Sequence, residues 1–169
     1  GEGHAPIFAP APPPPSNPNL PKISIISTGG TIANRVDYST GAVFPALSAH
    51  DLYTAVPELA DLANVETEIL FSVFSENLTP KHWSELSKTV YERCTRRDLR
   101  GVVVAHGTDT MGYTAAALSF ALQNLPVPVI LVGSQRSADR PSSDSATNLT
   151  AAVTAAATAP FAEVAVAMH

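Results

Sequence analysis

Short apolar runs alternate with amphipathic stretches along the chain from residue 23 onward. The run at 23–27 is rich in β-branched residues, and the run at 101–105 is apolar throughout. Runs of this length predict strands, and an uninterrupted one predicts a strand that is covered on both faces. Three more strands are predicted, the first of them partly exposed because apolar and charged residues alternate in its first half: 65–74, 127–132 and 164–168.

Helical patterns fill the spaces between these strands. Ser48 is a capping residue for a helix that Pro57 ends, and Thr79-Pro80 is a typical helix start for a segment that runs to about Cys94. Alanine-rich segments at 110–124 and 143–158 predict two more helices, whereas Gly41 and Pro45 predict a loop over 34–47. The alternation predicts an α/β fold, a doubly wound and mainly parallel sheet with flanking helices.

The first 22 residues have a different composition, since they contain eight of the fifteen prolines. A segment of this kind favours the polyproline II conformation and buries no core, so we expect a proline-rich linker at 1–22, with a role as a ligand for a partner left open. Residues 23–169 are expected to be the folded domain. The chain starts with Gly and ends directly after an apolar run, which suggests a fragment.

Composition narrows the function further. The chain has 169 residues, 45% hydrophobic, and a net charge of −5, which argues against a surface for duplex nucleic acid. Its four clustered arginines, at 93, 96, 97 and 100, are expected to form a solvated last helical turn. The single cysteine, Cys94, is expected to be a buried, inert thiol. No membrane span and no signal pattern is visible, so we expect a cytoplasmic protein.

Polar residues follow four of the predicted strands. They are Thr28-Gly29-Gly30-Thr31, Ser75-Glu76-Asn77, His106-Gly107-Thr108-Asp109-Thr110 and Gly133-Ser134-Gln135-Arg136. Ligands bind beyond the carboxyl ends of the strands in open α/β sheets, so these segments are expected to converge. A threonine beside a glycine turn at a helix N-terminus suits acyl transfer, with a nucleophile next to an oxyanion hole. The alternative is that Thr28 and Thr31 only cap the following helix.

Several common sites are absent from the sequence. It has no Gly-x-Gly-x-x-Gly, no Walker lysine and no Gly-x-Ser-x-Gly motif. The five histidines show no metal-ligand spacing, so no metal is expected. His106 stands at a strand end, and we expect it to form hydrogen bonds behind the site.

Two segments, "STGGTIA" at 27–33 and "HGTDTM" at 106–111, resemble the signature segments of the bacterial-type asparaginase/glutaminase family. The resemblance covers 23–169 and implies hydrolysis of a side-chain amide by a threonine nucleophile, without a cofactor. Within the family, three stretches resemble the D subunit of the archaeal glutamyl-tRNA(Gln) amidotransferases more than a free asparaginase. They are 35–47, 74–77 and 133–149, of which "DRPSSD" within the last carries the most weight.

The resemblance also implies roles for individual residues. Thr31 matches the nucleophile, Tyr38 the lid tyrosine that activates it, and Thr108 the second catalytic threonine. Asp109 matches the carboxylate that binds the substrate ammonium group, and Ser75 with Glu76 the substrate clamp. Backbone N–H groups of Thr108 and of the glycine turn would hold the oxyanion, which makes Gly30 and Gly107 part of the binding site.

The resemblance implies partners too. Glutamine or asparagine would be the substrate, and a homodimer is expected because family sites are completed by a neighbouring copy of the chain. The E subunit of the amidotransferase would use the released ammonia, with ATP and Mg²⁺, on Glu-tRNA(Gln). One departure is that the family's catalytic lysine lies beyond the fifth strand, after His169. We therefore expect this chain alone to be inactive or nearly so. A free L-asparaginase and a non-catalytic module that binds an amino acid or a partner remain alternatives.

Overall fold

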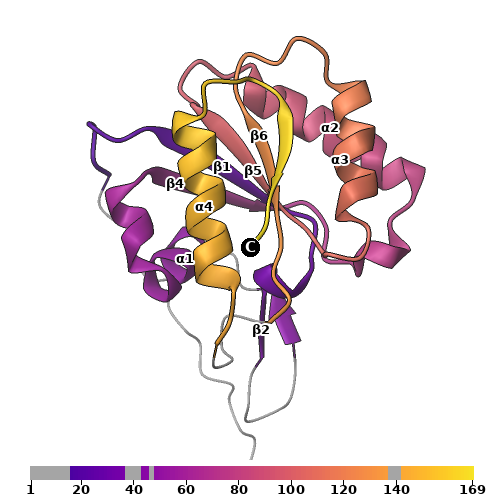
Figure 1. Ribbon diagram of the computed structural model, residues 1–169, viewed down its shortest axis with the longest axis horizontal. Coiled ribbons are helices and arrows are strands. Elements are labelled where there is room, and N and C mark those ends of the chain that lie inside the picture. The colour runs from indigo at the N-terminus through magenta and orange to yellow at the C-terminus, as the bar shows by residue number, and fades with distance from the viewer. Residues whose placement is uncertain (1–15, 37–42, 46–47, 137–141) are drawn as a thin grey trace, which may run out of the picture.

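Five parallel strands form one sheet in the computed structural model, which describes residues 16–36, 43–45, 48–136 and 142–169. In spatial order the strands are β4 (Asn64–Ile69), β1 (Lys22–Ser27), β5 (Gly101–Ala105), β6 (Val129–Val132) and β7 (Val164–Ala167). Every neighbouring pair is parallel, so all carboxyl ends meet at one edge (Figure 1). The predicted fold class is confirmed.

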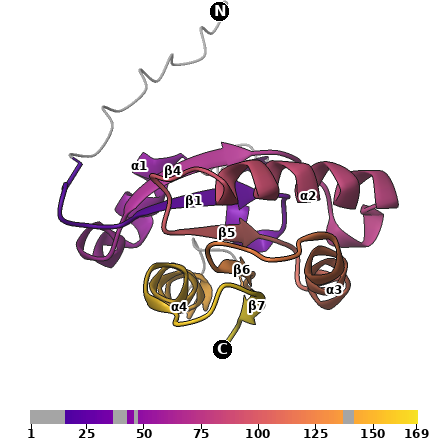
Figure 2. The same ribbon diagram turned by 90° about the horizontal axis from the view of Figure 1, so that it is seen from above.

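Helices cover both faces of this sheet (Figure 2). On one face lie α1 (Ala49–Ala55) and α4 (Ser145–Thr158), and on the other α2 (Pro80–Cys94) and α3 (Met111–Ala121). Alternation along β1 explains how one strand serves both layers, since Ile25 packs in the α1/α4 core and Ile26 in the α2/α3 core. The uninterrupted apolar character of β5 has the same cause, because all five of its residues are buried.

The expected start and core of α2 are confirmed. Thr79 accepts a hydrogen bond from the backbone of His82, whose side chain bonds the Thr79 N–H in return, and Pro80 occupies the first turn. Cys94 is 2% exposed. Burial raises the pKa of the Cys94 thiol to about 11, so the thiol stays protonated and unreactive at neutral pH.

Two predicted segments differ from the structure. The loop predicted at 34–47 contains an antiparallel hairpin of β2 (Asn34–Val36) and β3 (Val43–Pro45). The strand predicted at 65–74 ends at Ile69. Beyond it the N–H groups of Leu70 and Phe71 both donate to the Ser27 carbonyl, at the end of β1, so the chain leaves the ladder and turns across the sheet edge. An apolar run alone does not reveal this turn.

The prediction for the arginine cluster is wrong for two of its members. Arg96 forms a bidentate ion pair with Glu66 of β4, at 2.6 and 3.1 Å, and Arg93 pairs with Glu68. Lys22 also binds Glu66, at 3.0 Å. Burial alone would raise the pKa of Glu66, but the hydrogen bonds from Arg96 and Lys22 outweigh it and lower that pKa. These ion pairs tie the edge strand β4 to β1, to the last turn of α2 and to the residues just after it.

Hydrogen bonds also fix the end of the predicted linker. Asn64 accepts from the Asn17 N–H and donates to the carbonyls of Asn17 and Leu20. Residues 17–20 thus lie against β4, while the division at residue 22 remains a prediction. Within the ranges that the structure describes, no helix has the length and apolar character needed to cross a membrane.

Candidate active site

Four polar segments lie together at the carboxyl edge of the sheet, because β1, β4, β5 and β6 are parallel neighbours. They are the segments at 28–31, 75–77, 106–110 and 133–136. The β2–β3 hairpin extends from the same edge, at the bottom of Figure 1. The convergence expected from the sequence is thus present in the fold.

The loops after β1 and β5 touch backbone to backbone. Gly30 has a φ of +84°, and a Cβ built on it would lie 2.6 Å from the Gly107 nitrogen and 2.7 Å from its Cα. Only glycine tolerates both this φ and this approach. Thr31 and Thr108 each follow one of the two glycines, so their backbones are neighbours across the loop contact.

Ser75 is placed on the same contact from the other side. A Cβ on Gly107 would lie 2.8 Å from both Cβ and Oγ of Ser75, which is 5% exposed. The segment before Ser75 is held by the Val73 N–H, which donates to the Thr28 carbonyl, and the Thr110 hydroxyl donates to the Ser75 carbonyl at 2.9 Å. Loops after three strands, β1, β4 and β5, therefore interlock around Gly107.

The turn after β1 differs from the helix that was expected there. Only a short 3₁₀ turn, Thr31–Ala33, follows the glycine pair before β2 begins. Thr28 is 2% exposed, and its hydroxyl donates to the Ala105 carbonyl at 3.0 Å, as does its N–H. Thr28 therefore joins β1 to β5 and caps no helix, and the interpretation of this turn as an α-helix N-terminus is wrong.

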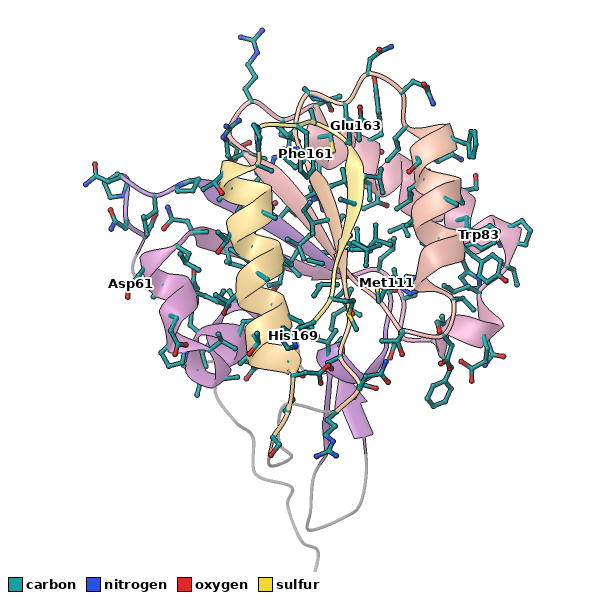
Figure 3. The ribbon with its side chains drawn as sticks, in the orientation of Figure 1. Asp61, Trp83, Met111, Phe161, Glu163 and His169 are labelled. Atoms are coloured by element: carbon teal, nitrogen blue, oxygen red, sulfur yellow. The ribbon has the colours of Figure 1, made fainter. Side chains whose placement is uncertain are left out.

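The loop after β6 completes the edge. A Cβ on Gly133 would lie 3.0 Å from the Thr108 methyl group and 2.9 Å from Cε of Met111, at the start of α3 (Figure 3). Asp144 accepts hydrogen bonds from the N–H groups of Gln135 and Arg136. Burial alone would raise the pKa of Asp144, but its hydrogen bonds, led by those from Gln135 and Arg136, outweigh burial and lower that pKa.

Asn148 links the ends of β6 and β7. Its Nδ2 donates to the Gly133 carbonyl at 3.0 Å, and its Oδ1 accepts from the His169 N–H at 3.0 Å. Asn148 is 1% exposed, so both bonds are shielded from water. His169 lies near the lower end of α4 in Figure 3, at the same edge as the other loops.

The structure brings most of the predicted site residues to this edge. Thr31 and Thr108 are half-buried, Ser75 is buried, and Glu76 and Asp109 are exposed. Tyr38 lies outside the described residues, as do the first three residues of "DRPSSD", 139–141. Among the residues that the structure describes, no group of His, Cys, Asp or Glu is arranged to hold a metal ion.

Sequence reasoning missed the polar residues that support this edge. They are Thr114, Asp144 and Asn148. The available signal was position, because Asp144 directly precedes a helix and Asn148 lies one turn into α4. Their partners, however, come from other loops that no local pattern identifies.

This arrangement suits a small polar substrate. Thr31 and Thr108 directly follow the two glycines in contact, and exposed carboxylates, Glu76 and Asp109, belong to the loops after β4 and β5. Hydroxyls are nucleophiles when a base is near, exposed carboxylates bind ammonium groups, and unpaired backbone N–H groups stabilise an oxyanion. Acyl transfer is a reaction that uses groups of all three kinds.

Comparison with known proteins agrees with this geometry. The D subunit of glutamyl-tRNA(Gln) amidotransferase from Pyrococcus abyssi is 59% identical over 152 residues, which are 90% of this chain and 34% of the relative. The protein of the same name from Methanopyrus kandleri is 52% identical over 171 residues, with 100% and 37% covered. The chain thus spans about a third of the length of the curated relatives it matches.

A solved structure shares the fold. The thermostable L-asparaginase from Thermococcus kodakarensis superposes with a TM-score of 0.78 at 34% identity, over 87% of this chain and 44% of that one. The sequence model of the family described as "Asparaginase, N-terminal" matches residues 22–169. With signature segments, fold and sequence in agreement, the chain belongs to the asparaginase family.

Proposed function

We propose that this chain is the catalytic N-terminal portion of the D subunit of an amidotransferase, which releases ammonia from glutamine for the conversion of Glu-tRNA(Gln) to Gln-tRNA(Gln). Relatives at 52–59% identity bear the name of that subunit, which supports this choice. The partner would be the E subunit of the same complex, which would supply the ATP- and Mg²⁺-dependent step. We also propose a homodimer in the cytoplasm and contact with tRNA only through the complex.

The observation that carries the proposal is the backbone contact between Gly30 and Gly107, which makes neighbours of the residues that follow them. A nucleophile and the groups that activate it must meet within hydrogen-bond reach of one substrate atom. Thr31 and Thr108 follow strands that are far apart in the sequence. The contact between the preceding glycines brings the two loops together at one edge of the sheet. This contact supports the roles that we propose for both threonines.

In the proposed reaction the Thr31 Oγ1 attacks the amide carbonyl of glutamine, and its proton passes to a base that includes Tyr38. The oxyanion is held by the Thr108 N–H and by one N–H of the glycine turn. The C–N bond then breaks, ammonia leaves with the transferred proton, and the acyl group remains as an ester of Thr31. Water hydrolyses the ester, which yields glutamate and restores the hydroxyl.

Binding of the substrate is assigned to the exposed carboxylates and to Ser75. We assign the ammonium group of glutamine to Asp109 and Glu76, and its carboxylate to donors near Ser75. The close approach of the Ser75 side chain to Gly107 supports this assignment, because it holds the proposed binding group next to the proposed oxyanion donor. Position of the substrate and stabilisation of the transition state are thus coupled through one glycine.

The experiment uses the full-length protein, together with the E subunit, ATP and Glu-tRNA(Gln). Thr31→Ala is expected to lower glutamine-dependent amidation at least about 1,000-fold, and Thr31→Ser to retain part of it. Thr154→Ala, an identical change at an exposed position of α4, is the control and should keep full activity. Amidation that persists in Thr31→Ala would remove the nucleophile and the mechanism.

The free asparaginase is the second candidate, because the solved structure that shares this fold is an L-asparaginase. One methylene separates the substrates, and a pocket discriminates by only ~1–3 kcal/mol per methylene. Association with the E subunit decides between the two. The asparaginase would be favoured if free asparagine is hydrolysed faster than glutamine and addition of the E subunit produces no amidation. A non-catalytic module would show neither activity.

A further inference from the structure

Three side chains, two of them fully buried, form a chain of hydrogen bonds behind the end of β5. His106 and Thr114 are both 0% exposed, and the His106 Nε2 lies 2.7 Å from the Thr114 Oγ1. The indole N–H of Trp83 donates to the same hydroxyl at 2.9 Å. At the other end, His106 Nδ1 lies 2.6 Å from the Gly107 carbonyl oxygen. Trp83 comes from α2 and Thr114 from α3, so both helices hold these hydrogen bonds in place.

The partners determine where the protons are. A carbonyl only accepts, so the His106 Nδ1 carries a hydrogen and donates it to Gly107. An indole N–H only donates, so the Thr114 oxygen accepts from Trp83 and gives its own hydrogen to the His106 Nε2. The hydrogen bonds of these side chains are all satisfied when the imidazole is neutral. Burial favours the same neutral form, because it lowers the pKa of His106. With both ring nitrogens occupied, His106 is no general base for a substrate.

The bond to Gly107 fixes one particular peptide unit. The Gly107 carbonyl and the Thr108 N–H belong to the same planar trans peptide, so the N–H points away from the imidazole. Gly107 must be glycine, because a Cβ there would lie 2.8 Å from both the Cβ and the Oγ of Ser75. A glycine peptide has little orientation of its own, and an external bond must supply it. Within the described part of the chain, no backbone hydrogen bond occupies the Thr108 N–H.

We propose that His106 is a positioning residue, which Thr114 and Trp83 hold in place and which aims the Thr108 N–H at the oxyanion of the reacting amide. This inference rests on the proposed amide hydrolysis. A preorganised donor costs no reorganisation when charge develops, whereas a peptide that is free to rotate must first be ordered. His106 therefore acts on the transition state without touching the substrate.

The first test compares His106→Asn with His106→Leu in the full-length protein, by steady-state glutaminase kinetics. The Asn amide can donate from nearly the same position as Nδ1, whereas Leu cannot donate at all. We expect Leu to lower kcat about 100-fold, as for the loss of one oxyanion donor, with KM changed less than about twofold. Asn should retain at least about ten times the kcat of the Leu variant.

A second pair keeps the imidazole and changes only its support. Thr114→Val has the same shape but leaves the His106 Nε2 without a donor, and Thr114→Ser keeps the hydroxyl. Valine should lower kcat about tenfold and serine by less than about twofold. In a ¹⁵N NMR spectrum at neutral pH the wild-type His106 should show a protonated Nδ1 and an unprotonated Nε2, and Thr114→Val should lose this signature.

The outcomes separate the two proposals. An inactive Thr31→Ala with unchanged kcat in His106→Leu and Thr114→Val would overturn the positioning role and leave the nucleophile intact. A parallel fall of kcat and Tm in all four variants, with no recovery by Asn or Ser, would overturn it in favour of a purely structural role. Full activity of Thr31→Ala would overturn the hydrolysis itself and the positioning role with it.

Discussion

Gly30 lies directly against the backbone of Gly107, at a distance that excludes even one methyl group. The two residues come from loops after β1 and β5, which pair as parallel neighbours. Their contact joins the segment that carries Thr31 to the segment that carries Thr108. It is the part of the candidate site that tolerates the least change.

Substitution of Gly30 by Ala should therefore remove activity and lower stability. The new Cβ would meet the Gly107 nitrogen at 2.6 Å, and the φ of +84° is unfavourable for alanine. We expect a loss of about 2–4 kcal/mol in the free energy of unfolding, measured with urea, and a glutaminase rate near background.

Gly112→Ala is the matched control for this change. No atom lies within 4 Å of a Cβ at Gly112, which is exposed in α3. Alanine favours the helix, so this variant should gain about 0.5–1 kcal/mol and keep its activity. If Gly30→Ala and Gly112→Ala change the free energy of unfolding equally, the close approach of Gly30 to Gly107 does not determine stability.

Asp109→Asn should weaken substrate binding. The exposed carboxylate is proposed to bind the substrate ammonium group, and a charge-assisted hydrogen bond contributes about 1.5–3 kcal/mol. KM for glutamine should rise roughly 10- to 100-fold, with Tm unchanged. An unaltered KM would assign the ammonium group to another residue.

Glu66→Gln should destabilise the edge of the sheet. Glu66 lies between Lys22 and Arg96 with its side chain 28% exposed, and the amide replaces a shared carboxylate. We expect a loss of about 1–2 kcal/mol in urea unfolding, smaller in 1 M salt. Glu58→Gln, the same change at an exposed position, should cost less than about 0.5 kcal/mol.

Stability should decline in acid through His106. Its pKa is lowered by burial, so the unfolded chain binds a proton that the folded chain does not. The free energy of unfolding is therefore unaffected by His106 above its ordinary pKa of about 6.5. Below that pH it falls, by at most about 1.4 kcal/mol per pH unit. Urea unfolding between pH 7.5 and 5 should show a smaller decline in His106→Asn than in the wild type. Equal slopes would mean that other groups account for the decline.

The sequence was most informative about buried elements. Continuous apolar runs such as the one in β5 predicted the parallel sheet, and Thr79 with Pro80 predicted the start of α2. The short hairpin of β2 and β3 was missed, because strands of three residues give too little periodicity. The apolar run after Ile69 misled because hydrogen bonds to Ser27, and not composition, end β4.

The sequence likewise predicted one part of the candidate site and missed another. Polar residues at strand ends were found because parallel strands bring their carboxyl ends to one edge. The interlocking contacts were not found, because the approach of Gly30 to Gly107 and the bond from Thr110 to Ser75 join loops distant in sequence. Arg93 and Arg96 were placed in solvent for the same reason, since their acidic partners lie on β4.

The position of β1 has a consequence for synthesis of the chain. Ile23 pairs with Val65 on one side and with Gly101 on the other, so a strand made before both of its partners lies inside the sheet. At ~5–20 residues per second, its second partner emerges about 4–15 s later. Until then one edge of β1 lacks its partner strand, so we expect the nascent chain to be a target for a holding chaperone.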